Sequence, residues 1–154
     1  KVYSLWNTFL LGGLYLIAMV RQRLYIEEYD WTVDVFYSVD KYSYLRAIYR
    51  LEYIGCPFHL LNRITDKIKT EKYNYGVTYS NDKCTVIIIS HSTSDEEFMN
   101  TLEHEKQHMI GHIIDYYGIK PSSEEAGYLA GYVGALFTKP IKDEICDCCK
   151  KKLK

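Results

Sequence analysis

Residues 94–117 read SDEEFMNTLEHEKQHMIGHIIDYY. Ser94 and Glu97 form a capping box, in which each side chain satisfies a backbone N–H group of the first helical turn. Gly118 follows directly, and glycine is the commonest residue just past the end of a helix. The stretch therefore predicts one long helix that spans residues 95–117.

This predicted helix has an apolar face and a separate histidine face. At about 100° per residue, the apolar side chains fill one continuous arc of the helix. The arc contains Phe98, Met99, Leu102, Met109, Ile110, Ile113, Ile114 and Tyr117. His104 and His108 fall on the opposite side of the helix. Lys106 falls inside the arc, where we expect its stem to pack and its amine to reach solvent.

The histidine face carries the motif H-E-x-x-H over residues 104–108. His104 and His108 lie one helical turn apart, about 6 Å along the axis, so both imidazoles can reach one metal ion. Glu105 can reach a water molecule bound to that ion and act as a general base. The motif therefore predicts a Zn²⁺ site with two histidine ligands and Glu105 as a catalytic residue.

A hydrolytic zinc site needs a third protein ligand. His112 lies about 12 Å from His104 along the helix axis, which is too far for a shared ion. The better candidate lies in the last predicted helix, over residues 123–137, where Glu124 leads a stripe that also contains Gly127, Tyr128, Gly131 and Ala135. Apart from Tyr128 the stripe has small side chains, which predicts a close approach of two helices and favours Glu124 as the ligand. Glu125 is the alternative, because it leads a neighbouring stripe of larger side chains.

Tyr128 follows Glu124 by one helical turn. We expect it either to contact the metal-bound water or the substrate carbonyl, or simply to pack. It is therefore a second candidate catalytic residue.

The rest of the chain alternates between strand and helix patterns. From the N-terminus it predicts a helical start, a strand over 31–39, helices over 40–54 and 58–68, a hairpin of strands 73–80 and 83–90, and the two helices described above. In the first strand, Trp31, Val33, Val35, Tyr37 and Val39 are expected on the core face, with Asp34 on the polar face. The order of elements predicts an α+β fold.

The composition is that of one globular domain. The chain has 154 residues, of which 47% are hydrophobic and 25% charged, and a formal net charge of −1. That charge argues against nucleic-acid binding, which depends on clustered Lys and Arg. We expect one domain over residues 1–139, with an apolar segment over 1–25 packed on it, and a Cys- and Lys-rich tail over 140–154.

The five cysteines favour a reducing compartment, because their number is odd and Cys146, Cys148 and Cys149 crowd into the tail. We therefore expect a cytoplasmic protein. The tail spacing is too tight for an ordinary zinc knuckle. Residues 3–20 are strongly apolar but interrupted by polar residues and glycines, so we do not expect them to cross a membrane.

The H-E-x-x-H motif followed by Glu124 on a later helix resembles the gluzincin class of zinc metallopeptidases. The segments NYGVTYSN (74–81), TSDEEFMNTLEH (93–104) and EEAGYLAGY (124–132) also resemble minimal zincin-like proteins of gut Bacteroidales and their phages. The resemblance covers residues 26–138. It implies a zincin-like fold, with a small mixed or antiparallel sheet, a central H-E-x-x-H helix and a C-terminal helix that bears a ligand.

The resemblance also implies roles for individual residues. His104, His108 and Glu124 would bind zinc, and Glu105 would activate water. An edge strand, expected over residues 83–90, would hold an extended peptide by strand addition.

The leading hypothesis is thus a zinc-dependent metallopeptidase that acts on a peptide or protein substrate. One alternative is a catalytically inactive zincin-like module with a binding or structural role in a phage or mobile element. A second alternative is a membrane-associated protein anchored by residues 3–20.

Overall fold

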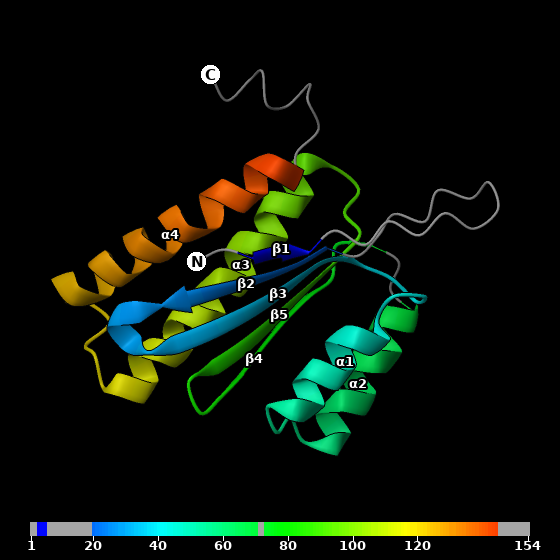
Figure 1. Cartoon of the computed structure of the whole chain (residues 1–154), viewed down its shortest axis with the longest axis horizontal. Coiled ribbons are helices and arrows are strands. Elements are labelled where there is room, and N and C mark those ends of the chain that lie inside the picture. Colours follow the sequence, from blue (N-terminus) through cyan, green and yellow to red (C-terminus); the bar gives the residue numbers. More distant parts are fainter. Residues whose placement is uncertain (1–2, 6–19, 71–72, 145–154) are drawn as a thin grey trace. The chain divides into compact units, whose positions relative to one another are not determined.

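The computed structural model describes residues 3–5, 20–70 and 73–144. Its strands are β1 (Tyr3–Leu5), β2 (Val20–Ile26), β3 (Trp31–Val39), β4 (Gly76–Asn81) and β5 (Cys84–Ser90). Its helices are α1 (Leu45–Tyr53), α2 (Phe58–Thr70), α3 (Asp95–Tyr117) and α4 (Glu124–Glu144), and a short 3-10 turn, η1 (Glu27–Tyr29), precedes β3. The protein therefore has the mixed α+β architecture that the sequence predicts (Figure 1).

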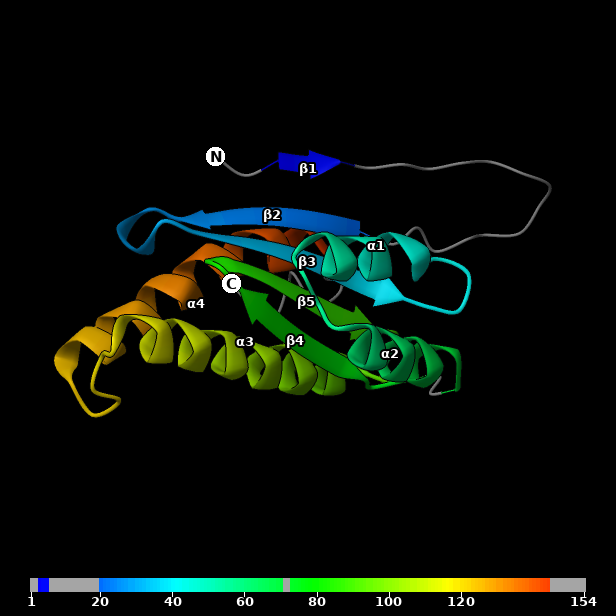
Figure 2. The same cartoon turned by 90° about the horizontal axis from the view of Figure 1, so that it is seen from below.

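The strands form one mixed sheet in the order β1-β2-β3-β5-β4. β3 pairs with β5 in parallel, and the other neighbouring strands pair antiparallel. The chain passes from β3 to β5 through α1, α2 and β4. Figure 2 shows the strands from a second direction, with α1 and α2 following β3 along the chain.

The structure forms two compact units, residues 1–109 and 110–154, with the division inside α3. The single domain expected over 1–139 stays a prediction. Most of the apolar N-terminal segment and the cysteines of the tail lie outside the described residues. No helix in the described part of the chain has the length and apolar character that crossing a membrane requires.

Several predicted elements are confirmed. α3 has the predicted bounds, and Ser94 Oγ accepts a hydrogen bond from the Glu97 backbone N–H at 3.2 Å, as expected for its N-cap. The hairpin is also present, and Asp82 and Lys83 occupy its turn with φ of 42° and 58°. Two positive φ values in succession are typical of the turn that joins two tightly paired strands.

Two element predictions are wrong. The sequence predicts a helical start. In the part of the N-terminal region that the structure describes, the chain instead forms the strands β1 and β2, which pair antiparallel. The last helix does not end before Pro140 but continues to Glu144. Proline removes one backbone hydrogen bond without stopping every helix, whereas the prediction treated it as a terminator.

β3 is the central strand, and both of its faces are buried. Asp34 and Phe36 are buried on the face expected to be polar, with exposed fractions of 0% and 1%. Val39 packs in the same cluster as Phe36, so it is not on the face of Val35. The reason is an irregularity after Phe36, where Ser38 adopts a φ of 55° and the pairing register shifts. The prediction of a half-buried strand is therefore wrong.

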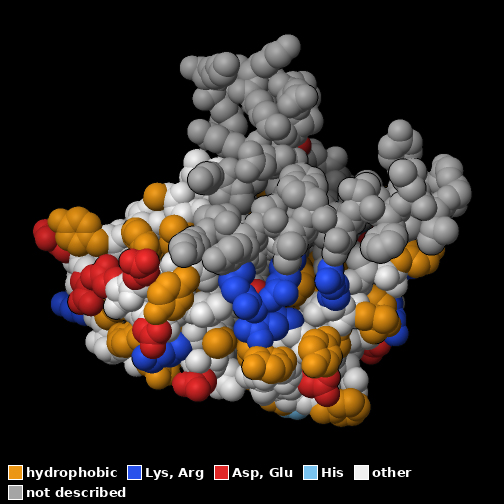
Figure 3. Space-filling view, in the orientation of Figure 1, with side chains coloured by type: hydrophobic (Ala, Val, Ile, Leu, Met, Phe, Trp, Pro, Cys, Tyr) orange, Lys and Arg blue, Asp and Glu red, His pale blue; other side chains and the backbone are white. Residues whose placement is uncertain are grey.

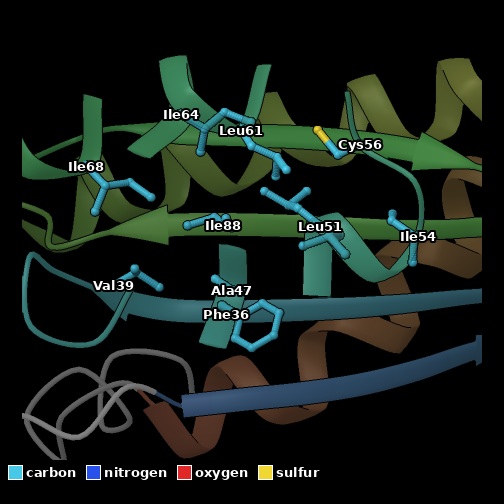
Figure 4. Packing of buried hydrophobic residues seen from close by; sticks show 11 residues of the cluster. Phe36, Val39, Ala47, Leu51, Ile54, Cys56, Leu61, Ile64, Ile68 and Ile88 are labelled. Carbon is cyan, nitrogen blue, oxygen red and sulfur yellow. The ribbon is translucent and has the colours of Figure 1, made fainter. Parts of the chain in front are cut away.

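One face of the sheet is covered by α1 and α2. Their apolar side chains meet those of β3 and β5 in a single buried cluster (Figure 4). The cluster consists of Phe36, Val39, Ala47, Leu51, Ile54, Cys56, Leu61, Ile64, Ile68, Val86 and Ile88. The opposite face meets the first part of α3, where the rings of Tyr37 and Phe98 lie 6.0 Å apart. The first part of α3, up to Met109, belongs to the same compact unit as the sheet.

Candidate active site

The two histidines of the motif converge in space. The Nε2 atoms of His104 and His108 lie 3.0 Å apart, and their rings meet edge to face with centroids 4.6 Å apart. Both residues are exposed, on the side of α3 opposite its buried residues, as the helical wheel predicts. Two nitrogen ligands of a tetrahedral zinc ion lie about 3.3 Å apart when each Zn–N distance is ~2.0–2.1 Å. The histidine pair therefore fits the donor spacing of a zinc site.

Glu105 lies about 100° around the helix from His104 and packs against β4 of the sheet. It is buried, with an exposed fraction of 5%, and its Oε2 accepts a hydrogen bond of 2.7 Å from Thr78 Oγ1 on β4. The same hydroxyl lies 3.0 Å from the backbone oxygen of Glu105. Within the described part of the chain, no Lys or Arg pairs with this carboxylate. Glu105 is thus held beside the strand by a neutral donor.

Gly76 allows β4 and α3 to approach closely at this point. A Cβ atom placed on Gly76 would lie 2.5 Å from Oε1 of Glu105 and 2.8 Å from Cγ2 of Thr101. Real Cβ atoms do not approach other atoms so closely, so a larger residue would displace Glu105 or the strand. A glycine inside a strand pattern, as Gly76 is in the predicted strand 73–80, often marks such an approach.

β4 is the edge strand of the sheet at this end. The expectation that residues 83–90 form the edge is wrong, because β5 pairs with β3 on one side and β4 on the other. The sequence gives no signal for this order, since β3 and β5 pair across a long connection. The strand that touches Glu105 is therefore also the strand with an open side.

Lys106 is buried, and its charge is compensated locally. Its Nζ atom lies 2.7 Å from Glu103 Oε1, one turn back along α3. The side chain of Lys106 is 7% exposed and that of Glu103 48% exposed. The stem therefore packs as predicted, and the amine is held by a carboxylate at the surface.

The candidate third ligand and Tyr128 belong to α4. Glu124 is its first residue, Tyr128 follows one turn later, and both are exposed. The small-residue stripe of α4 is also exposed, and a Cβ on Gly127 or Gly131 would meet no described atom within 4 Å. The buried face of α4 is made by Ala126, Leu129, Val133 and Phe137. The close seam expected along the stripe is wrong, so it no longer favours Glu124 over Glu125.

No group of three His, Cys, Asp or Glu side chains that could hold a metal ion occurs among the residues that the structure describes. His104 and His108 are brought together as a pair, and Glu105 lies beside Thr78. Glu124 as third ligand and Tyr128 as catalytic residue stay predictions.

Sequence reasoning missed two residues of this arrangement, Gly76 and Thr78. Gly76 carries a signal, because it interrupts an otherwise β-branched and aromatic strand. Thr78 carries none, because its importance depends on which strand lies next to α3.

Comparison with known proteins finds no match to this chain: no family model fits it, and no curated protein or solved structure is significantly similar to it.

Proposed function

We propose that the protein is a zinc-dependent metallopeptidase of zincin-like type, with His104 and His108 as two of its metal ligands. The observation that carries this proposal is the 3.0 Å separation of the two Nε2 atoms, on a helix whose next residue, Glu105, presents a carboxylate to an edge strand. Beside this pair, the buried carboxylate of Glu105 has no Lys or Arg partner among the described residues. Zinc bound by the pair would lower the pKa of a bound water to about 7 and polarise the scissile carbonyl.

Glu105 has the role of general base. It takes one proton from the attacking water, whose oxygen forms a bond to the carbonyl carbon of the peptide. When the C–N bond breaks, Glu105 returns that proton to the leaving nitrogen. Thr78 donates a hydrogen bond to Oε2 of Glu105, which would hold the carboxylate in position for this proton transfer.

The open side of β4 has the role of the peptide-binding surface. A strand at the end of a sheet has unpaired backbone N–H and C=O groups, which an extended peptide can pair with. Thr78 lies in this strand and touches Glu105, so a peptide added to β4 would run beside the general base. Glu124, with Glu125 as its alternative, is proposed as the third ligand, and Tyr128 as a contact for the scissile carbonyl.

The first test is the metal content of the purified protein after zinc addition and dialysis. We expect about one zinc per chain in the wild type and a strongly reduced content in His108→Ala. His59→Ala is the matched control, because His59 is also an exposed histidine on a helix, α2. A wild type without bound zinc, or equal zinc in all three proteins, would contradict the proposal.

The second test is cleavage of a peptide library by the zinc-loaded protein. We expect cleavage that Glu105→Gln abolishes while zinc is retained. Bound zinc without any cleavage would instead assign the chain to the alternative, an inactive zincin-like binding module.

A further inference from the structure

A second cluster of charged residues lies in the middle of the sheet. Asp34 of β3 is fully buried, and its carboxylate accepts five hydrogen bonds from Arg21, Arg23 and Arg50. The shortest of these joins Arg50 Nε to Asp34 Oδ2 at 2.6 Å. Arg21 and Arg23 come from β2, and Arg50 comes from α1. We call these four residues the arginine cluster.

The arginine cluster lies on the sheet face opposite Glu105. In the pairing register, Asp34 is opposite Val86, and Val86 is opposite Tyr79 of β4. Thr78 is the next residue of β4, and successive side chains of a strand point to opposite faces. The cluster is therefore separate from the proposed active site, and the two can be tested independently.

The charges of the arginine cluster do not balance. Three guanidinium groups surround one carboxylate, which leaves two positive charges in excess. A single arginine with a bidentate contact satisfies a buried carboxylate, and Arg23 already makes one, through Nε to Oδ1 and Nη2 to Oδ2. Burial of Asp34 thus explains one arginine but not three.

Most hydrogen-bond donors of the arginine cluster are not used by Asp34. Each guanidinium has five N–H donors, so the five bonds to Asp34 use about a third of them. No second carboxylate pairs with these groups among the described residues. The side chains of Arg21, Arg23 and Arg50 are 34%, 47% and 16% exposed, so their remaining donors are accessible in part.

The guanidinium groups are also fixed in place. Arg21 lies over the ring of Phe36 at 5.7 Å, and Arg50 lies over the ring of Tyr53 at 4.7 Å. Aromatic contacts and the shared carboxylate together restrict the rotation of long side chains, which lowers the entropy cost of binding. Figure 3 shows Lys and Arg side chains gathered over the middle of this face, beside hydrophobic side chains.

We propose that Arg21, Arg23 and Arg50, held by Asp34, bind a phosphate dianion, either free or as the monoester group of a small molecule. A phosphate group carries a charge of about −2 near neutral pH, which matches the excess charge of the cluster. Its oxygens also match the planar fork of a guanidinium group, which favours arginine over lysine. Asp34 acts as a positioning residue that orients the three forks.

The test is a titration of the folded full chain with inorganic phosphate by calorimetry, at constant ionic strength set with sodium chloride. We expect saturable binding at one site per chain. We expect Arg23→Gln to weaken it about tenfold or more, the effect of losing one charge-assisted contact. Asp34 keeps Arg21 and Arg50 in that variant, so the fold is expected to survive, and circular dichroism checks this.

The matched control is Arg63→Gln, which removes the same charge from an exposed position on α2. Its phosphate affinity should equal that of the wild type. Arg23→Lys keeps the charge without the fork, and we expect it to bind more weakly than the wild type. If Arg23→Gln does not fold, the phosphate affinity of Arg23→Lys tests the proposal in its place.

A parallel titration with O-phosphoserine distinguishes the two sources of the group. Equal affinities support free phosphate, and tighter binding of O-phosphoserine supports a monoester. Absence of saturable binding with both probes would overturn the proposal, as would equal affinity in Arg23→Gln or Arg23→Lys and the wild type. Loss of zinc binding or peptide cleavage would leave this result unaffected.

Discussion

Asp34 and Glu105 are both buried carboxylates that face opposite sides of the same sheet, and their surroundings differ sharply. Asp34 is surrounded by three guanidinium groups, whereas Glu105 accepts one hydrogen bond from the neutral hydroxyl of Thr78. A carboxylate with strong cationic partners stays ionised and serves to hold them in place. The carboxylate of Glu105 has no such cationic partner among the residues that the structure describes. The contrast supports an anchoring role for Asp34 and is compatible with the role of general base that we propose for Glu105.

The largest expected effect concerns Glu105. Glu105→Gln keeps the size of the side chain but removes the base, so kcat/KM for peptide cleavage should fall by about a hundredfold or more. Zinc content should stay unchanged. Glu52→Gln is the control, because Glu52 is an exposed residue of α1. Full activity in Glu105→Gln would contradict the role of Glu105 as general base. The proposed functional difference between Glu105 and Asp34 would then no longer hold.

The next largest effect concerns Asp34. Asp34→Asn leaves three guanidinium groups around a neutral amide, and we expect the free energy of unfolding to fall by about 3 kcal/mol. Urea denaturation measures this change, with Asp66→Asn on the exposed side of α2 as the control. A loss as small as that of the control would show that Asp34 does not anchor the arginine cluster.

The pH dependence of stability should differ between the wild type and Asp34→Asn. Burial by itself raises the pKa of Asp34, but the hydrogen bonds from Arg23, Arg21 and Arg50 outweigh it and lower the pKa below its usual value. The stability that this group contributes is therefore fully present above about pH 4 and is lost as the pH falls through the lowered pKa. Wild-type stability should fall more steeply in acid than that of Asp34→Asn. Parallel curves would contradict the assignment.

A smaller effect is expected where β4 meets α3. Gly76→Ala places a methyl group against Glu105 and Thr101, and we expect a loss of about 1–3 kcal/mol in stability together with lower peptidase activity. Gly127→Ala is the opposite case, because its methyl group meets no described atom within 4 Å. It should stabilise α4 by about 0.5–1 kcal/mol. A loss of stability in Gly76→Ala but not in Gly127→Ala would support close packing around Glu105.

The smallest change is the loss of one hydroxyl group. Thr78→Val removes the donor to Glu105, and we expect about 1 kcal/mol lower stability and about tenfold lower kcat, with zinc content unchanged. Thr78→Ser keeps the hydroxyl and should restore most of the kcat. If Thr78→Ser were as impaired as Thr78→Val, the methyl group rather than the hydrogen bond would position Glu105.

Local patterns predict the helix side of this arrangement well. The bounds of α3 follow from its capping residues, and the separation of His104 and His108 from the apolar face follows from helical periodicity. The hairpin of β4 and β5 follows from two strand patterns separated by a short polar turn. Each of these features depends on residues that are close together in the sequence.

The sheet side depends on contacts that no local pattern contains. The alternating pattern of the strand predicts Asp34 on an exposed polar face. Its burial depends on Arg21, Arg23 and Arg50, which lie elsewhere in the sequence and surround it in the fold. The edge position of β4 follows from the parallel pairing of β3 with β5. The partner of Glu105 could not be named for the same reason, since Thr78 lies 27 residues earlier in the chain.

The parallel pairing of β3 with β5 also bears on how the chain folds. It joins Thr32 to Cys84, so about fifty residues of intervening chain must be closed into a loop before the pair can form. The hairpin of β4 and β5 closes over a two-residue turn and can form on a microsecond timescale. We therefore expect β4, the proposed peptide-binding strand, and β5 to pair first and then to dock together on β3. Docking of this preformed hairpin, rather than its formation, should limit the refolding rate.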